Sequence, residues 1–337
     1  MVYIEKQKKP LYILIVVLSI ILALLLLRVF TVVERMVNTS EAPEDDQYAY
    51  EDGGRPQYLI DGAWYVQKSN IETVLLIGID KFEAAIRDGT GYRNNEQSDA
   101  LFLLAIDRYN NTYSILHLNR DTMVNIRALD VSGKPYMTFD GQLAISHTYG
   151  TGREDSCLNT AWSVSDYLYG LQIDHYVSFS MDAVAVINDA VGGVKLTVMD
   201  DLTPVDPALV EGREVTLMGE QALLYIRARS ELTKNTNLDR MKRQRQYVDA
   251  LLRKASDSFR TDDSFAADVL RDVKDYIVSD YTGSQLLTFT DVVKNYTEGT
   301  IRDIDGTARQ GEKYMEFYAD EDALRSLLLE MFYTAKK

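Results

Sequence analysis

The sequence predicts a mixed α/β fold, in which a largely antiparallel central sheet is flanked by helices and preceded by one transmembrane helix. Three observations lead to this prediction. Residues 11–27 run for 17 positions without a charge, which is close to the shortest apolar run that spans a bilayer. Beyond about residue 70, short apolar runs typical of buried strands are mixed with amphipathic segments of helical period. These do not alternate strictly, which favours a mixed sheet over a parallel one.

The N-terminal segment has the charge pattern of an uncleaved anchor. Three lysines precede the apolar run: Lys6, Lys8 and Lys9. Because basic residues stay on the cytoplasmic side, we expect a cytoplasmic tail at 1–10, an anchor at 11–33 and all later residues outside the membrane. A cleaved signal peptide is the alternative. Its apolar region would be unusually long, and Pro43 follows the best cleavage context at 40–42.

Residues 34–69 have the composition of a stalk. Acidic residues gather there together with proline and glycine, and such a segment buries too little apolar surface to form a core. Its charge is repelled by an anionic membrane surface. We therefore expect an acidic extracytoplasmic stalk, followed by a single folded domain at 70–337.

The charge, the cysteine and histidine content and the missing motifs exclude several classes of function. The chain has 36 basic and 51 acidic residues and a formal net charge of −15, which argues against general nucleic-acid binding. Cys157 is the only cysteine, so there is no internal disulfide, and His117, His147 and His175 lack metal-ligand spacing. The motifs GxxxxGK[ST], GxGxxG, GxSxG and HExxH are missing from the sequence, so hydrolysis by a serine nucleophile or a zinc-bound water has no support.

The first three strands bring charged residues to one sheet edge. We predict strands at 72–80, 99–107 and 112–119, the last two joined by a hairpin-length link. If successive strands run up, down and up, Asp80, Asp99 and Arg120 emerge at the same edge. A long polar loop between the first two strands would lie over them, and such loops are often functional.

The later elements follow from periodicity. We predict helices at 141–149, 157–170 and 181–191, strands at 175–181 and 194–198, and a segment at 219–229 that begins as a helix. A further helix starts near Asp239. From about 255 to 337 the pattern is helix, link, strand-like link and helix, with no break in composition that would separate another domain.

A basic stretch at 225–246 interrupts the acidic chain. It holds seven basic and two acidic residues, a local charge of +5. Five of the seven are arginines, whose guanidinium groups bind phosphate oxygens bidentately. Arg227 and Arg229 are two positions apart, so they point the same way if the chain there is extended.

In the helix predicted after Asp239, some of the basic side chains are expected to face the protein interior. Arg240, Arg243 and Gln244 share an arc beside its apolar face, whereas Lys242 does not. A solvated basic helix face is the simpler alternative. Because arginine pairs flank a short polar loop and border apolar segments, we favour an anion-binding cleft.

Seven motifs in this order resemble the LytR-CpsA-Psr family of cell-envelope phosphotransferases. They are VLLIGID (74–80), QSDAL (97–101), LNRDT (118–122), HYVSF (175–179), INDAVGGV (187–194), LLYIRAR (223–229) and LDRMKRQ (238–244). The resemblance implies an α/β/α sandwich anchored in the membrane of a Gram-positive-type bacterium. It also implies transfer of a glycopolymer from an undecaprenyl-pyrophosphate carrier to peptidoglycan, with Mg²⁺.

The resemblance also implies roles for individual residues. Asp80 and Asp99 match the acidic pair that holds the metal and activates the acceptor, and Arg120 matches a catalytic arginine. The residues expected to bind the pyrophosphate are Gln97, Arg120, Arg227, Arg229, Arg240, Arg243 and Gln244. The chain departs from the family at Gln97, where an arginine is usual, so that one contact is neutral or supplied by Arg93, and at Asn119, where a proline is usual.

The polymer is left open among teichoic acid, capsular and other secondary wall polysaccharides. Two other functions fit the same residues: a non-catalytic binder of polyprenyl-phosphate glycans that regulates the envelope, and a pyrophosphate hydrolase. Phosphoryl transfer needs positioned cations and a metal more than covalent catalysis, and an arginine cleft with two carboxylates supplies both. A lipid tail would need an apolar tunnel, for which the helix at 181–191 is a candidate wall or simply part of the core.

Overall fold

The computed structural model describes residues 49–50, 56–60, 62–82, 86–88, 91–228, 236–262 and 264–336. The expected cytoplasmic tail and anchor, most of the stalk and Arg229 lie outside these residues. Within the described part of the chain, none of the helices combines the length and the apolar character needed to cross a membrane.

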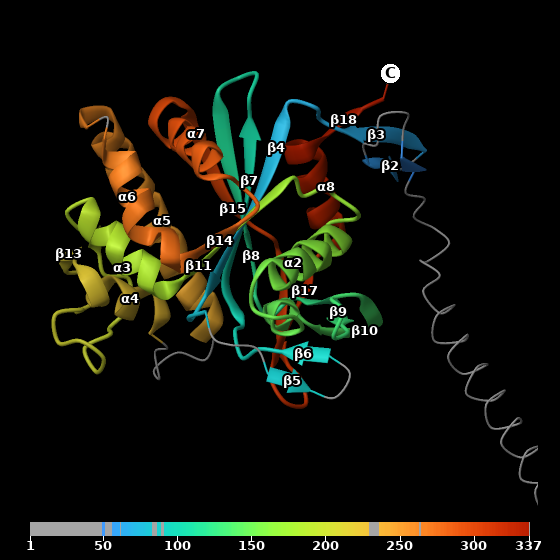
Figure 1. Ribbon diagram of the computed structural model, residues 1–337, viewed down its shortest axis with the longest axis horizontal. Coiled ribbons are helices and arrows are strands. Elements are labelled where there is room, and N and C mark those ends of the chain that lie inside the picture. Colours follow the sequence, from blue (N-terminus) through green and yellow to red (C-terminus); the bar gives the residue numbers. More distant parts are fainter. Residues whose placement is uncertain are drawn as a thin grey trace, which may run out of the picture. The chain divides into compact units, whose positions relative to one another are not determined.

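A six-stranded mixed sheet forms the centre of the described part (Figure 1). Its strands, in spatial order, are β14 (Ile277–Ser279), β11 (His175–Ser180), β4 (Ile71–Ile79), β7 (Ser98–Asp107), β8 (Thr112–Leu118) and β15 (Thr297–Asp303). The β11–β4 and β8–β15 pairs are parallel and the other three are antiparallel. The predicted mixed sheet is therefore confirmed, including the up-down-up order of its first three strands.

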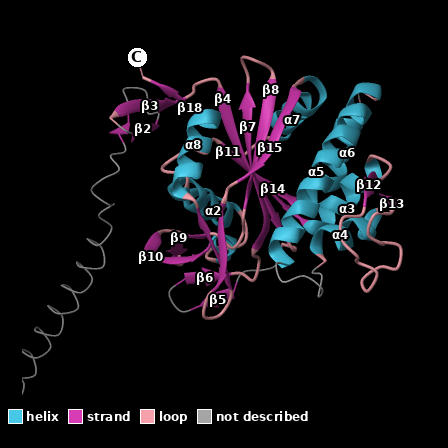
Figure 2. Ribbon diagram, turned by 180° about the vertical axis from the view of Figure 1, so that it is seen from behind, coloured by secondary structure: helices cyan, strands magenta, loops and turns pink. Residues whose placement is uncertain are grey.

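Helices cover both faces of this sheet, on opposite sides in Figures 1 and 2. Side chains alternate along each strand: in β4, Leu75 and Ile77 pack on one side, and Val74 and Leu76 on the other. The first side receives α2 (Glu154–Tyr167) and α8 (Glu321–Phe332). The second receives α5 (Thr236–Thr261) and α7 (Gly283–Asn295). Burial on both faces explains why these strands are continuously apolar in sequence.

A second cluster of helices packs against α5. It contains α3 (Met181–Ala190), α4 (Gly219–Arg227), α6 (Phe265–Val273) and the hairpin of β12 (Val194–Thr197) and β13 (Glu214–Leu217). Gly193, which joins α3 to β12, has a φ of +84°, and a Cβ there would lie 2.9 Å from the Leu217 carbonyl oxygen. Only glycine fits this close turn.

Part of the predicted stalk is folded. Strands β2 (Pro56–Ile60) and β3 (Ala63–Gln67) pair with each other, with β1 (Ala49–Tyr50) and with β18 (Tyr333–Ala335) in a small sheet. Tyr58 is 4% exposed and belongs to the main core. The prediction of a stalk to residue 69 is corrected for 56–60 and 63–67, because this short stretch contains apolar and aromatic residues that an averaged composition hides.

Several polar strands differ from the sequence prediction. The hairpin of β9 (Met123–Leu129) and β10 (Pro135–Gln142) leads into a 3₁₀ helix, η1 (Leu143–Thr148), where an α-helix was expected at 141–149. The loop after β4 contains β5 (Ile86–Asp88) and β6 (Gly91–Arg93), and the C-terminal part adds η2 (Lys274–Tyr276) and the hairpin of β16 (Gly306–Gln310) and β17 (Met315–Ala319). Strands β10 and β16 are largely exposed and lack a continuous apolar run, and β17 has one buried residue.

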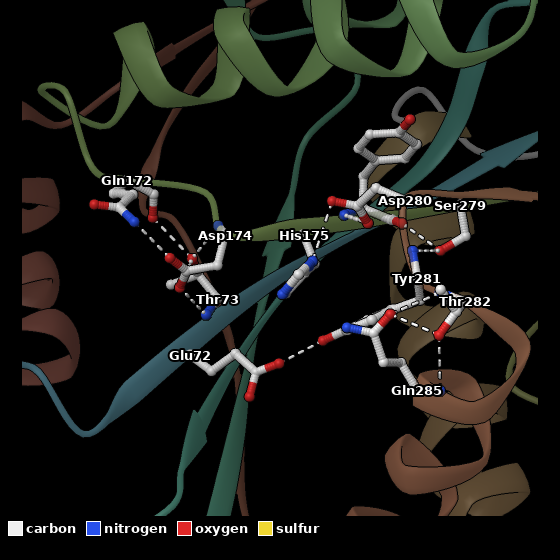
Figure 3. Close-up of polar contacts among 11 residues, drawn as sticks. Glu72, Thr73, Gln172, Asp174, His175, Ser279, Asp280, Tyr281, Thr282 and Gln285 are labelled. Atoms are coloured by element: carbon white, nitrogen blue, oxygen red, sulfur yellow. Dashed lines mark hydrogen bonds and ion pairs between the residues drawn. The ribbon is translucent and has the colours of Figure 1, made fainter.

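Polar contacts fasten the edge strand β14 and the start of α7 to the sheet (Figure 3). His175 stacks on Tyr281 with ring centroids 4.2 Å apart, and its Nδ1 lies 3.1 Å from an Asp280 carboxylate oxygen. The Tyr281 hydroxyl donates to Glu72 at the start of β4. A capping box at Thr282 begins α7. This network lies at the opposite end of β4 from Asp80.

Candidate functional site

Asp80 and Asp99 lie at the same end of the two central strands, β4 and β7. Asp80 follows the last residue of β4, and the register of β4 on β7 shifts there: Gly78 pairs with Ala100 and Ile79 with Ser98. Asp99 is thus the extra residue of a bulge, a feature that re-aims side chains near functional sites. A Cβ at Gly78 would approach the Ala100 Cβ to 3.1 Å, so glycine suits this close pairing.

Asn119 shapes the turn that carries Arg120. Its side-chain oxygen accepts hydrogen bonds of 2.9 Å from the Asp121 N–H and from Asn237 of α5. Its carbonyl accepts from the Thr122 N–H and hydroxyl. These bonds form an Asx-type turn, so Asn119 supplies through its side chain the constraint that proline would supply through its ring.

Two arginines surround the Asp99 carboxylate. Arg120 pairs with Asp99 and also donates to Gln97, while Arg240 lies 3.8 Å from the same Asp99 oxygen and donates to Asn237. The Arg120 and Arg240 side chains are 9% and 7% exposed, and that of Asp99 is 24% exposed. The structure therefore joins Gln97, Asp99, Arg120 and Arg240 in one partly buried polar cluster.

Arg227 and Asp80 form a separate, open ion pair beside this cluster. Their atoms are 2.7 Å apart, and the side chains are 47% and 48% exposed. A pair this exposed contributes little to stability, so either partner can exchange it for a ligand at small cost. Arg227 is the last residue of α4, which agrees with the predicted helical start of 219–229. The direction of Arg227 relative to Arg229, which was predicted only for an extended chain, lies outside the described residues.

Arg243 does not face this site, which corrects its expected role in binding pyrophosphate. Its side chain is 0% exposed. The guanidinium donates to the carbonyl oxygens of Tyr225 and Ala228 at the end of α4 and pairs with Asp200. Arg243 therefore holds the C-terminus of α4, the segment that carries Arg227. The inward arc predicted for Arg240, Arg243 and Gln244 is correct, but the three side chains meet different surroundings.

The segment that leads into Gln97 and Asp99 is held by hydrogen bonds to residues 147–150. Asn94 is 3% exposed and donates to the carbonyls of His147 and Gly150, while the His147 Nδ1 lies 3.1 Å from the Glu96 carbonyl oxygen. Burial lowers the pKa of His147 to about 4, so a neutral imidazole donates this bond. Arg93, considered as a substitute for Gln97, lies over the Tyr149 ring at 4.9 Å.

An apolar cavity of about 250 Å³ lies between the sheet and the helices on its second face. Its wall includes Met181, Val184 and Ile187 of α3, as expected for the helix at 181–191, and Val248 and Leu252 of α5. Gln244 is the one amide among the side chains that line it in the described chain. It lies one helical turn after Arg240, at the end of the cavity nearest the polar cluster.

Asp80 and Asp99 are the two partly exposed carboxylates of this site that could hold a metal ion. In the described ranges, no group of three or more histidine, cysteine, aspartate or glutamate side chains could hold a metal by itself. Mg²⁺ does not require such a group, since it commonly binds one or two carboxylates plus substrate phosphates and water. Cys157, in contrast, is buried, and burial raises the pKa of its thiol to about 12, which agrees with a structural role.

Several site residues were missed by the sequence prediction. They are Asp121, Gln142, Asn237 and Asp200, together with Asn94 as the anchor of the loop. Each becomes meaningful only through a partner distant in the sequence. Asp121 alone carried a signal, because it follows Arg120 directly.

The family of the chain is decided by a match over most of its length. A model of the LytR_cpsA_psr family matches residues 33–331. The chain belongs to the LytR_cpsA_psr family.

Curated relatives of this LytR_cpsA_psr chain are named as transferases. It is 28% identical over 231 residues to "polyisoprenyl-teichoic acid–peptidoglycan teichoic acid transferase TagU" of Bacillus mycoides, covering 68% of this chain and 66% of that protein. The relative of the same name in Bacillus cereus is 28% identical, with 69% and 67% covered. The chain thus spans about two thirds of the length of these relatives.

Solved structures share the fold. A Streptococcus agalactiae protein gives a TM-score of 0.62 at 20% identity, covering 78% of this chain and 87% of that one. A structure described as TagT bound to LI-WTA gives 0.59 at 20% identity, with 78% and 90% covered. B. subtilis TagV gives 0.58 at 23% identity, with 78% and 98% covered. These likenesses confirm a mixed α/β sandwich with a central sheet between helices.

Proposed function

We propose that this protein is a phosphotransferase that moves a glycopolymer from a polyprenyl-pyrophosphate carrier onto peptidoglycan. One observation carries the proposal: a single face of α5 presents Arg240 at the polar cluster and Gln244, Val248 and Leu251 to the apolar cavity. Positions three and four apart share a helix face. The site therefore suits a molecule with an anionic head and a long apolar tail.

The arginines would bind and orient the phosphates. Arg120, Arg227 and Arg240 each pair with a carboxylate in the described structure. Phosphate oxygens compete for the same guanidinium groups through charge-assisted, often bidentate hydrogen bonds. Binding would thus move each arginine from an aspartate to the substrate, where positive charge stabilises the oxygens as phosphoryl transfer proceeds.

The carboxylates released in this exchange would then serve the chemistry. Asp99 would accept the proton of the attacking hydroxyl, and Asp80 and Asp99 would hold Mg²⁺ together with substrate phosphate oxygens. When bound, the metal supplies positive charge for the pyrophosphate group. Gln97 would hold Arg120 in place beside Asp99, through the hydrogen bond it accepts from that arginine.

The names of the relatives favour teichoic acid as the polymer. At 28% identity this assignment is a proposal for the present chain, and capsular or other wall polysaccharides remain to be compared in the same assay. The alternatives, a binder without turnover and a pyrophosphate hydrolase, predict no product linked to peptidoglycan.

We also propose that residues 11–33 anchor the protein with its folded domain outside the membrane. The lysines before this segment and the acidic residues after it support this orientation. Protease added to intact cells stripped of their wall is expected to remove everything beyond about residue 35. Protection until lysis would reverse the assignment.

Asp99→Asn separates an enzyme from a binder. With lipid-linked glycan, peptidoglycan oligomers and Mg²⁺, the variant is expected to lose at least about 10²-fold in transfer rate, the usual effect of removing a positioned acid–base group. Lipid binding should persist because the arginines remain, and loss of turnover with retained binding identifies a group used mainly in the transition state.

Both quantities are measured on one preparation, with products identified by mass spectrometry and with a chelator arm. Wild-type turnover in Asp99→Asn would remove this residue from the mechanism. Transfer that is indifferent to the chelator would remove the metal. A released phosphoglycan without a peptidoglycan-linked product would identify a hydrolase.

A further inference from the structure

A second, polar cavity lies at the N-terminal end of α5. It measures about 260 Å³, and its wall includes Arg120, Asp121, Asn237 and Arg240. Among the described residues, it shares no lining side chain with the apolar cavity. Its volume holds on the order of nine waters, which is room for one sugar ring with a substituent and not for a folded partner.

Distant segments are fastened together to form this cavity. Gln142, at the end of β10, donates to the Asp121 carboxylate at 2.9 Å and to the Met315 carbonyl at 2.8 Å. The Phe317 N–H donates to the Asp121 carbonyl at 2.9 Å. The β16–β17 hairpin is therefore held against the turn that carries Arg120, and the cavity is a fixed feature of the fold.

The lining groups suit a sugar better than a lipid. Asp121 accepts hydrogen bonds, the two arginines donate them, and the amides of Gln142 and Asn237 do both. Tyr314, which is 40% exposed, also lines the cavity and offers an aromatic ring with a hydroxyl. Met315 completes the wall and gives it an apolar part. Such a mixture matches the hydroxyl and N-acyl groups and the apolar ring face of an amino sugar better than it matches a polyprenyl chain, which has no hydrogen-bonding groups.

The position of the polar cavity indicates that it binds the acceptor glycan and not the lipid-linked donor. Along one face of α5, Asn237 and Arg240 line the polar cavity, and Gln244, Val248 and Leu251 line the apolar one. At 1.5 Å per residue, the helix face from Asn237 to Leu251 is about 20 Å long. In phosphoryl transfer the attacking and leaving oxygens are roughly in line. If the carrier lies in the apolar cavity, the acceptor must approach from the Asn237 end of this helix face, where the polar cavity lies.

We propose that the polar cavity is the acceptor site, which holds one amino-sugar residue of the acceptor glycan and presents its hydroxyl to Asp99. This inference rests on the proposed function. The hydroxyl oxygen forms a bond to the phosphorus that bears the glycopolymer, and the bond from that phosphorus to the bridging oxygen breaks. The carrier leaves as its monophosphate, and the hydroxyl proton passes to the Asp99 carboxylate.

A competition experiment on the wild-type full chain in detergent tests whether acceptor and donor occupy separate places. Saturation-transfer NMR follows a soluble peptidoglycan tetrasaccharide while farnesyl diphosphate is added to saturation. The sugar signals are expected to persist. Their displacement would place the sugar in the donor site and overturn the inference. Failure of farnesyl diphosphate to bind at all would overturn the proposed function as well.

Tyr314→Ala tests the cavity itself. The variant is expected to raise the KM for the acceptor roughly tenfold, the effect of losing about 1.4 kcal/mol of binding. Its affinity for farnesyl diphosphate should stay within about twofold of wild type, since no donor contact is altered. Tyr109→Ala is the matched control, because Tyr109 is 83% exposed in the β7–β8 link at the other end of the sheet.

Met315→Trp, which places a larger side chain in the wall of the polar cavity, is a second, independent variant. It is expected to raise the KM for the acceptor and to leave the affinity for farnesyl diphosphate unchanged, and melting temperatures verify that each variant is folded. A wild-type acceptor KM in both folded variants, with transfer intact, would overturn the acceptor site while leaving the proposed function standing. A parallel fall in donor affinity would equally contradict it.

Discussion

Arg240 and Lys242 lie two positions apart on α5 and face different surroundings. The Arg240 side chain is 7% exposed beside Asp99, whereas the Lys242 side chain is 63% exposed and pairs with Asp239 at 3.3 Å. Local charge is therefore a poor guide to binding in this stretch. The direction in which each side chain points decides whether it can reach a phosphate.

Arg240→Ala is expected to weaken binding of polyprenyl pyrophosphate by roughly 1.5–3 kcal/mol, the range for hydrogen bonds to charged groups. Lys242→Ala, from the same helix, should change it little. Calorimetric titration of both variants with a short-chain prenyl diphosphate provides the comparison. Equal losses at the two positions would indicate a diffuse basic surface in place of a cleft.

Single residues were predictable where local geometry determined them. The convergence of Asp80, Asp99 and Arg120 followed from antiparallel strand order, and the inward arc of α5 followed from helical periodicity. The role of Arg243 was not predictable, because its partners at Tyr225 and Asp200 come from other elements. The same is true of Asn119, whose turn depends on side-chain hydrogen bonds.

Among the elements, α4 depends on α5 for its C-terminal end. The last carbonyls of a helix lack partners within it and attract cations. Here the Arg243 guanidinium supplies both hydrogen bonds and charge to the carbonyls of Tyr225 and Ala228. The position of Arg227, at the end of α4, is thus fixed indirectly by a buried residue of the neighbouring helix.

Arg243→Met is expected to lower the free energy of unfolding by about 3 kcal/mol, since it leaves Asp200 and two carbonyls without their partner. Its affinity for prenyl diphosphate should fall too. Arg227→Ala, at an exposed position, should lose affinity with stability unchanged. Urea denaturation and ligand titration measure both effects. Loss of affinity in Arg243→Met without loss of stability would mean that Arg243 contacts the ligand directly.

Elements were predictable in proportion to their burial. The apolar strands β4, β7 and β8 were placed to within about one residue, because both of their faces are covered. The polar hairpins β9–β10 and β16–β17 were not found. The edge strands β14 and β15 were not placed either, because β14 has only three residues and β15 is largely exposed and lacks a continuous apolar run.

At the scale of the whole molecule, helix α5 links the apolar cavity to the polar cluster of Gln97, Asp99, Arg120 and Arg240. Gln244 and Val248 of this helix line the apolar cavity, and Arg240, one turn before Gln244, belongs to the polar cluster. A ligand that reaches from the apolar cavity to the polar cluster gains from apolar burial and from charge-assisted hydrogen bonds. Affinity should therefore depend on the tail as well as on the head of the substrate.

Val248→Phe places a larger side chain in the apolar cavity. It is expected to weaken binding of a long prenyl diphosphate by at least roughly tenfold, while inorganic pyrophosphate binds as before. Lys254→Phe, on the exposed side of the same helix, is the matched control. Unchanged binding of the long prenyl chain in Val248→Phe would exclude this cavity as the place of the tail.

The small sheet of β2, β3 and β18 has a consequence for the timing of folding. Lys336 donates to Gln57, 279 residues earlier in the chain, and β18 pairs with β3. At roughly 5–20 residues per second, a ribosome needs on the order of 15–60 s to cover that distance. During this interval the backbone N–H and C=O groups of β3 that later pair with β18 have no partner strand. A nascent chain of this protein therefore exposes that side of β3 to proteases and chaperones until β18 has been synthesised.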